Sequence, residues 1–352
     1  MKRNNKRYWR KITAQNKKYA THDYYYGNDS SKFGSGGIIA ITILVISIGM
    51  AVLASKGYTP QIIIEKIRYA GEHIEDANAG TSEYGKKYDS TEHKGYDYNS
   101  YIYDQICTNI DDNKSTIQLT IPATYSTDVI NDAFSKVYRD HPEFFWITGG
   151  AHSYGITTGA ASVCTVTLST RCDKSDIPVM RSELDSIVNS IVASASANCN
   201  TDYEKALWVH DYLVQNCEYD FSTLISHEMN LEDGKSLGFT SYGCLVNHKA
   251  VCDGYSKAYM LIMNKLGVEC GYVCGTGTNA MGSGLHSWNY IRLDDGYYMV
   301  DVTWDDPLVI GYSDGSCRRD YFCITTDMIL EDHEIDDGQD IPICNGGKYV
   351  NY

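Results

Sequence analysis

Residues 250–256 have the sequence AVCDGYS, and this stretch decides how the rest of the chain is organised. Beyond Cys252, apolar residues recur at intervals of three and four as far as Gly267. They are Tyr255, Ala258, Tyr259, Ile262 and Leu266. This spacing predicts an amphipathic helix that begins at Cys252. Because a helix N-terminus offers free N–H groups and the positive end of the helix dipole, this position favours a thiolate, the nucleophilic form of cysteine.

A β-hairpin is predicted downstream of this helix. Aromatic and β-branched residues fill 286–293 and 297–304, on either side of the turn sequence DDG at 294–296. An Asp-Gly turn between two such runs is typical of a hairpin. With the turn centred on its two aspartates, His286 and Asp301 are diagonal neighbours on one face, roughly 7–8 Å apart at the backbone. A turn shifted by one residue would place them on opposite faces, so their proximity is a hypothesis about the register.

Cysteine, histidine and aspartate in this arrangement fit the chemistry of acyl transfer. A Cys252 thiolate attacks a carbonyl carbon, and His286 takes and later returns a proton. Asp301 fixes the tautomer of the imidazole and stabilises its cation. The oxyanion would be held by the N–H of Cys252 and one further donor. Tyr242 is a candidate for that donor, and a packed aromatic side chain is the alternative interpretation of Tyr242.

Four motifs in this order resemble the core of the transglutaminase-like superfamily of cysteine enzymes. They are YG at 242–243, AVCDGY at 250–255, HSWN at 286–289 and VDVTWD at 300–305. The resemblance implies an α+β fold with papain-like, transglutaminase-like architecture, in which the nucleophile helix packs on an antiparallel sheet. It also implies that Cys252, His286 and Asp301 form a catalytic triad. No calcium or zinc motif is visible, so the sequence predicts neither a metal nor another cofactor.

Two details of the motifs remain open at the level of sequence. His248 stands where the resemblance implies a small residue in the loop before the nucleophile, which bears on how open the entrance to the site is. Trp288 and Trp304 either pack beside the triad or belong only to the core of the hairpin.

The amino-terminal part of the chain predicts a membrane anchor. Residues 1–36 contain nine of the 30 basic residues and two of the 45 acidic ones, which is typical of a disordered cytoplasmic tail. Residues 37–55 are apolar and uncharged, close to the ~20 residues that a helix needs to cross a bilayer. The basic tail predicts that the N-terminus is cytoplasmic and that the remainder is extracellular. A cleavable signal peptide is the alternative, but the polar lead and the length of the apolar run favour the anchor.

The predicted extracellular part divides into three segments. Residues 56–98 form a polar stalk, 99–180 a small α+β domain and 181–352 the transglutaminase-like catalytic domain. Strands are predicted at 116–121 and 162–169, and helices at 127–138, 183–197 and 202–217. Because this part is strongly acidic, nucleic acid is excluded as a partner on electrostatic grounds. The oligomeric state is not predicted.

Several histidines and cysteines have a second interpretation. His210 is either a second catalytic histidine or, as the apolar helix face favours, a hydrogen-bonded core residue. His333 lies among acidic residues and is either a metal ligand or, the interpretation we favour, part of a solvated charged face. Of the 12 cysteines, some are expected to pair in an exported segment, although many could be reduced and buried.

The sequence therefore predicts a cell-surface cysteine enzyme that acts on peptide or side-chain amide bonds of a protein or peptide through a thioester intermediate. Hydrolysis, as in a peptidase or amidase, is preferred on family tendency. A protein cross-linking transglutaminase is one alternative, and a catalytically inert cell-surface binding module is another. A glycan hydrolase would require two carboxylates in a cleft, and no such pair stands out.

Overall fold

The computed structural model describes residues 98–122, 128–158, 161–228, 235–279, 282–306 and 317–350. The predicted basic tail, membrane-spanning segment 37–55 and nearly all of the predicted stalk lie outside these residues. Among the described residues, no helix combines the length and the apolar character that crossing a membrane requires.

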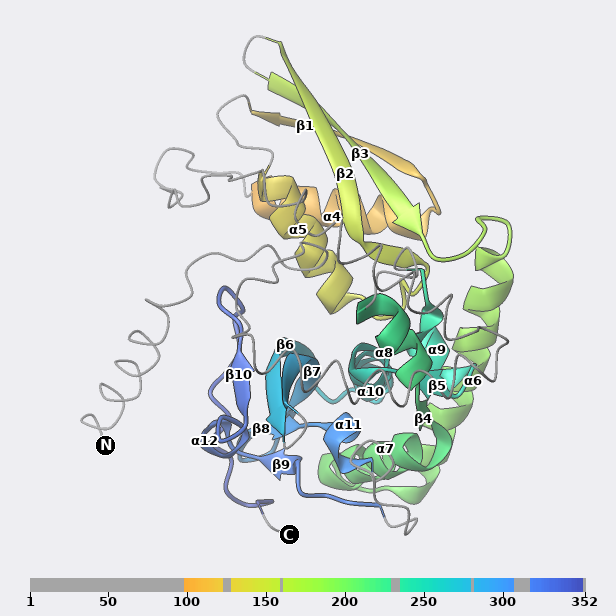
Figure 1. The fold of residues 1–352 in the computed structure, drawn as a ribbon. Helices are drawn as coiled ribbons and strands as arrows, with labels where there is room; N and C mark the ends of the chain where they lie inside the picture. The colour runs from red at the N-terminus through yellow and green to blue at the C-terminus, as the bar shows by residue number, and fades with distance from the viewer. Residues whose placement is uncertain are drawn as a thin grey trace, which may run out of the picture.

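The first described unit is a small α+β layer, drawn at the top of Figure 1. Its helices are α4 (Tyr98–Asp111) and α5 (Asp128–Asp140), and its strands are β1 (Thr116–Pro122), β2 (Ile147–Thr158) and β3 (Ala161–Thr170). The antiparallel sheet has the order β1-β3-β2. Ile102, Ile106 and Ile110 recur every fourth residue along α4 and are fully buried, which explains why this helix packs against the unit. The predictions for β1, α5 and β3 are confirmed, whereas α4 and β2 were not predicted.

Helices form most of the following segment. They are α6 (Ile177–Asn198), α7 (Asp202–Asn216), α8 (Phe221–Glu228), the 3-10 turn η3 (Leu237–Phe239), α9 (Ser241–Leu245) and α10 (Cys252–Lys265). A capping box formed by Thr201 and Glu204 starts α7, and the predicted helices 183–197 and 202–217 are confirmed. The predicted boundary between residues 180 and 181 falls inside α6. Between these helices, β4 (Glu218–Tyr219) and β5 (Lys249–Ala250) make a short parallel pair.

A five-stranded antiparallel sheet completes the described fold. Its strands are β6 (Cys270–Asn279), β7 (Gly282–Leu293), β8 (Gly296–Val300), β9 (Phe322–Ile324) and β10 (His333–Ile335), in the order β10-β6-β7-β8-β9. Two short helices, α11 (Val302–Asp305) and α12 (Thr326–Ile329), follow β8 and β9. Figure 1 shows α10 lying between this sheet and the other helices, so the predicted α+β architecture is confirmed as a mixed fold.

The predicted hairpin register is confirmed. Strand β7 pairs with β8 from Asn289 opposite Val300 to Leu293 opposite Gly296, which leaves the two aspartates 294–295 as the turn. The second strand, however, ends earlier than predicted. Asp301 caps a helical turn by accepting hydrogen bonds from the backbone N–H groups of Thr303 and Trp304, so residues 302–304 are helical rather than extended.

Helix α10 starts at Cys252 as predicted but is more deeply buried than an amphipathic helix. Its residues 253–263 are all buried, because the sheet covers one side and the preceding helices and the small unit cover the others. Gly254 permits this close packing. A Cβ at that position would lie 2.6 Å from the carbonyl oxygen of Gly238 and 2.7 Å from the Cβ of Ala250. The helix that carries Cys252 is therefore the centre of the domain.

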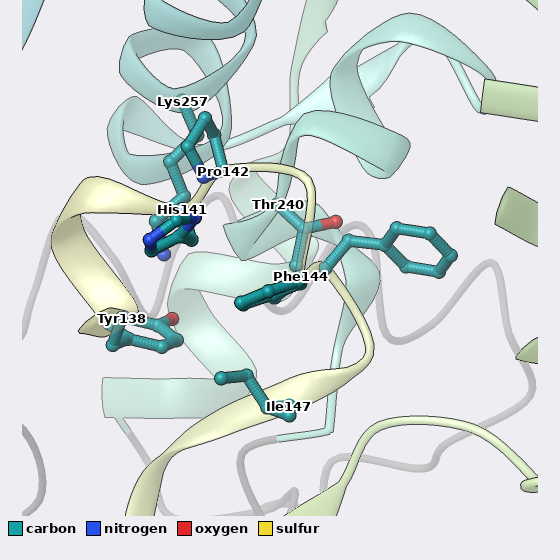
Figure 2. Close-up of a pocket in the computed structure, with 8 residues that line it drawn as sticks. Tyr138, His141, Pro142, Phe144, Ile147, Thr240 and Lys257 are labelled. Carbon is teal, nitrogen blue, oxygen red and sulfur yellow. The ribbon is translucent and has the colours of Figure 1, made fainter. Parts of the chain in front are cut away.

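A buried polar network joins the small unit to α10. Lys257 of α10 lies 3.2 Å from Asp253 and 3.5 Å from the centre of the Tyr138 ring. Asp253 also accepts a hydrogen bond from Tyr272, and Arg171 donates to the Tyr138 hydroxyl. Because Asp253 directly follows Cys252, this network fixes the start of the nucleophile helix. A small cavity beside the network is lined by Lys257 and residues of the α5–β2 corner, and none of the predicted triad residues borders it (Figure 2).

All 12 cysteines fall within the described residues and are free thiols. The expectation that some of them pair is therefore not met in this structure. Seven of the twelve are buried and four of the others, besides Cys252, are partly buried, in line with their use as small apolar residues.

Candidate active site

The structure brings Cys252, His286 and Asp301 together. Cys252 opens α10, His286 lies on β7, and Asp301 directly follows β8. The Nε2 atom of His286 is 2.6 Å from Oδ2 of Asp301, and the imidazole is near enough to Cys252 for the thiol to contribute to the raised pKa of His286. Cys252 is partly exposed, whereas His286 and Asp301 are buried.

The helix and the hairpin meet through Asn289 of the HSWN motif. Its side-chain amide donates to the backbone carbonyls of Ser256 on α10 and Gly271 on β6. Because Asn289 lies three residues after His286 on the same strand, these bonds fix the distance between the helix that begins at Cys252 and the strand that carries His286. This positioning role of Asn289 was not anticipated from the sequence.

Opposing effects set the charge of His286 and Asp301. Burial disfavours protonation of His286, but the charge and hydrogen bond of Asp301, together with the Cys252 thiol, outweigh it and raise the pKa of His286 to about 10. Burial alone would raise the pKa of Asp301. The charges and hydrogen bonds of His286 and His333 instead hold the pKa of Asp301 well below its usual range. The negative charge of Asp301 thus favours the protonated form of His286.

His333 is the main correction to the sequence-based predictions. It is not part of a solvated charged face, because it is 2 % exposed and lies on β10 against the candidate triad. Its Nε2 is 3.2 Å from Oδ2 of Asp301, and its Nδ1 is 2.6 Å from Oδ1 of Asp332. The acidic residues next to His333 in the sequence indicated an exposed position. The pairing of β10 with β6 instead brings His333 into the core.

Two tryptophans pack against the candidate triad. The ring centre of Trp288 lies 5.9 Å from that of His286, and the ring centre of Trp304 lies 5.3 Å from it. Gly277 of β6 makes room for Trp304, because a Cβ there would lie 2.7 Å from the indole ring. Both tryptophans therefore shield the imidazole from water, and the interpretation that they belong only to the hairpin core is wrong.

The remaining candidates have other partners. Tyr242 donates its hydroxyl to Glu183 at 2.6 Å and stacks on Phe145, which fits a packed aromatic side chain. His210 is fully buried on α7 and bonded to Asp211 and Asp305, so the favoured interpretation as a hydrogen-bonded core residue is confirmed. His248 is exposed, has a positive φ of 57° and lies 3.0 Å from the carbonyl oxygen of Asn216.

Comparison with known proteins agrees with this architecture. The model of the transglutaminase-like superfamily core matches residues 189–302. Human kyphoscoliosis peptidase is 26% identical over 166 residues, which are 44% of this chain and 23% of that protein. The chain thus spans about a quarter of the length of this curated relative.

Two solved structures were matched to parts of this chain. One, described as a TGase, covers 44% of both chains at 16% identity with a TM-score of 0.31. The other, a candidate cysteine protease from Cytophaga hutchinsonii, covers 46% of this chain and 65% of its own at 12% identity with a TM-score of 0.28. Structural similarity at this level carries no argument about function. Residues 189–302 contain Cys252, His286 and Asp301, so the segment that matches the core of the transglutaminase-like superfamily is the one that holds the candidate triad.

Proposed function

We propose that this chain is a cysteine enzyme that acts on peptide or side-chain amide bonds. One observation carries the proposal: Nε2 of His286 lies 2.6 Å from Oδ2 of Asp301, and the same imidazole interacts electrostatically with Cys252 at the start of α10. Covalent acyl transfer requires a nucleophile, a base and a group that orients the base, and Cys252, His286 and Asp301 would serve in these roles.

The proposed mechanism uses a thioester intermediate. The Cys252 thiolate attacks the amide carbon, and the developing oxyanion is held by N–H groups at the start of α10, which have no partner within a helix. His286 donates its proton to the leaving amine, so that the C–N bond breaks and the acyl group remains on sulfur. His286 then takes a proton from the incoming nucleophile, which attacks the thioester and releases the thiol. Asp301 holds the imidazole in orientation throughout.

The identity of the incoming nucleophile separates two activities. Water gives a peptidase or amidase, and an amine gives a cross-linking enzyme. We favour hydrolysis because the curated relative is a peptidase, although it matches this chain over a part of its length. We further propose a location at the cell surface, anchored by residues 37–55, with a protein or peptide as substrate; the composition of the sequence supports this.

Alkylation by iodoacetamide tests the proposal directly. We expect Cys252 of the full-length chain, purified in detergent, to react at pH ~6, where an ordinary thiol is sluggish. Peptide-resolved mass spectrometry compares it with Cys199 in the same molecule, a partly buried thiol whose pKa burial raises. His286→Ala should slow labelling of Cys252 and leave Cys199 unchanged.

The outcome separates enzyme from binding module. If Cys252 reacts no faster than Cys199, or the His286→Ala variant labels as fast as the wild type, the chain is better explained as an inert binding module. If Cys252 is selectively reactive, an amide donor is supplied with and without an amine acceptor. Release of free acid in the presence of the amine supports hydrolysis, and amide formation supports cross-linking.

A further inference from the structure

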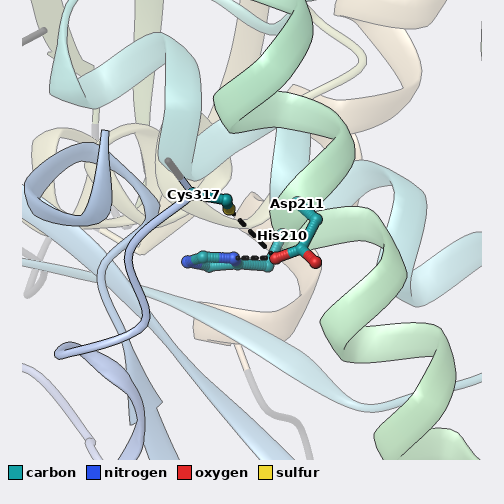
Figure 3. A group of neighbouring side chains, drawn as sticks. All are labelled: His210, Asp211 and Cys317. Carbon is teal, nitrogen blue, oxygen red and sulfur yellow. Dashed lines mark hydrogen bonds and ion pairs between the residues drawn. The ribbon is translucent and has the colours of Figure 1, made fainter. Parts of the chain in front are cut away.

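A second group of cysteine, histidine and aspartate side chains lies away from the candidate triad. His210 and Asp211 are neighbours on α7, and Cys317 begins the segment that leads into β9. The Nδ1 atom of His210 is 3.0 Å from Oδ1 of Asp211, and the sulfur of Cys317 is 3.1 Å from the same oxygen. Figure 3 shows the imidazole, the carboxylate and the thiol converging on one point, and their ligand atoms all lie within 4.8 Å of one another.

The imidazole of His210 is held in a fixed orientation through its second ring nitrogen, Nε2. Its Nε2 lies 3.0 Å from Oδ2 of Asp305, and both side chains are fully buried. Asp305 is itself held, because the backbone N–H of Tyr321 donates to its carboxylate oxygens. A buried carboxylate that binds one ring nitrogen and points the other toward a group of ligands is the usual support of a metal-binding histidine.

We propose that His210, Asp211 and Cys317 form a binding site for a divalent transition metal ion of the zinc type. Thiolate and imidazole ligands select zinc over magnesium or calcium, which prefer oxygen alone. With zinc bonded to nitrogen and oxygen at ~2.0–2.1 Å and to sulfur at ~2.3 Å, tetrahedral ligand atoms lie roughly 3.3–3.6 Å apart. The two separations that involve Oδ1 of Asp211, 3.0 Å and 3.1 Å, need to open by only a few tenths of an ångström.

Solvent access also suits an ion at this position. The Asp211 side chain is 22% exposed and Cys317 is partly exposed, so an ion can enter from solvent and keep a water as fourth ligand. On binding, the thiol proton of Cys317 and the Nδ1 proton of His210 leave to water. Arg319, whose guanidinium is 2.6 Å from Oδ2 of Asp211, orients the carboxylate from its other side.

The other cluster of ligand-type side chains in the described residues consists of His286, Asp301 and His333. It contains two residues of the candidate triad and the histidine bonded to Asp301, so its side chains already have a proposed role. The proposed ion would instead tie the segment after Cys317 to α7, at a site that does not depend on the proposed catalysis.

Cobalt and zinc binding to the full-length, reduced chain tests the site. We expect Co²⁺ to give a thiolate-to-cobalt charge-transfer band, and dialysed protein to retain one equivalent of zinc and unfold at a higher temperature than chelator-treated protein. Cys317→Ser removes the soft ligand but keeps a hydroxyl that can donate to Asp211, so folding is preserved while the band and the retained zinc are lost.

Two matched variants assign the signal to this site. Cys199→Ser removes a partly buried thiol elsewhere, and Cys252→Ser removes the candidate nucleophile; both should retain the band and the zinc. Absence of a thiolate band in the wild type overturns the proposal. A band that survives Cys317→Ser, or one that disappears with Cys252→Ser instead, overturns it as well, because the ion would then bind elsewhere.

Discussion

Asp301, at the N-cap of α11, and His333, on β10, are hydrogen-bonded to each other, with 3.2 Å between the carboxylate Oδ2 and the imidazole Nε2. The same oxygen lies 2.6 Å from Nε2 of His286, so one carboxylate is hydrogen-bonded to two imidazoles. Both ring nitrogens of His333 face carboxylate oxygens, Oδ2 of Asp301 and Oδ1 of Asp332. His333 therefore helps to hold the carboxylate that also contacts His286.

Substitution of His333 should weaken the candidate site through Asp301. His333→Ala is expected to lower the free energy of unfolding by roughly 2–4 kcal/mol and to slow Cys252 alkylation, because the hydrogen bond to a buried charge is lost. His333→Gln keeps a donor near Asp301 and should recover part of both losses. Urea unfolding and peptide-resolved labelling measure the two effects. Wild-type labelling in both variants would show that His333 serves the fold alone.

Asp301→Asn should lower the pKa of His286. Burial opposes the imidazolium, and the negative charge of Asp301 is what chiefly outweighs burial. Without that charge, the pKa of His286 is expected to fall from about 10 toward or below its ordinary ~6.5. Turnover at neutral pH should drop roughly 10²–10⁴-fold. Titration of His286 by NMR checks the shift, and an unchanged pKa would contradict the assigned cause. Asparagine still caps α11, so the loss of stability should be small.

Gly254→Ala should disturb the nucleophile despite the higher helix propensity of alanine. The new Cβ would lie 2.6 Å from a backbone oxygen, and such overpacking typically costs ~1–3 kcal/mol. We expect lower stability and slower Cys252 labelling, because the start of α10 must move. Gly284→Ala on β7 is the matched control, since no atom lies within 4 Å of its added Cβ. Equal effects of the two substitutions would argue against the role given to Gly254.

The buried pair of Lys257 and Asp253 should be strongly coupled. Both side chains are under a tenth exposed, so Lys257→Met leaves a buried carboxylate without its cation, a change that costs ~3–5 kcal/mol. Asp253→Asn combined with Lys257→Met removes both charges and should be less destabilising than the sum of the two single changes. Urea unfolding of the four proteins measures the coupling. Strict additivity would mean that the 3.2 Å contact contributes no interaction energy.

Asp336 should make the protein less stable as the pH rises. One of its carboxylate oxygens is buried without a hydrogen-bond partner among the described residues. Burial, aided by the charge of Asp337, raises the pKa of Asp336 to about 7. The folded state therefore binds this proton more tightly than the unfolded state, and the stability present below pH ~4 is lost as the pH rises to ~7.

The pH dependence of Asp336→Asn isolates this effect. The variant cannot ionise at this position, so its stability relative to wild type should rise between pH ~4 and ~7, by at most about 4 kcal/mol. Urea unfolding at several pH values provides the comparison. A stability difference that stays constant with pH would contradict the raised pKa of Asp336.

Local sequence determined the parts of the site that lie within one element or one turn. The three- and four-residue spacing after Cys252 and the Gly at 267 fixed the extent of α10, and the DDG turn fixed the register that brings His286 near Asp301. Both follow from backbone geometry over about a dozen residues, where the helical period and the two-residue alternation of strands are sufficient. The β-branched residues after Val300 predicted a longer β8. The strand ends at Val300 instead, because Asp301 caps α11 there.

Only the tertiary structure decided what meets across elements. The sheet order β10-β6-β7 brings His333 to Asp301, and the packing of α7 against α11 brings His210 to Asp305. Neither contact has a sequence signature, because strand order and helix packing depend on how the whole core is buried rather than on a local period. The sequence therefore predicted the candidate residues Cys252, His286 and Asp301, while the contact of His333 with Asp301 and the proposed metal site exist only where distant segments pack together.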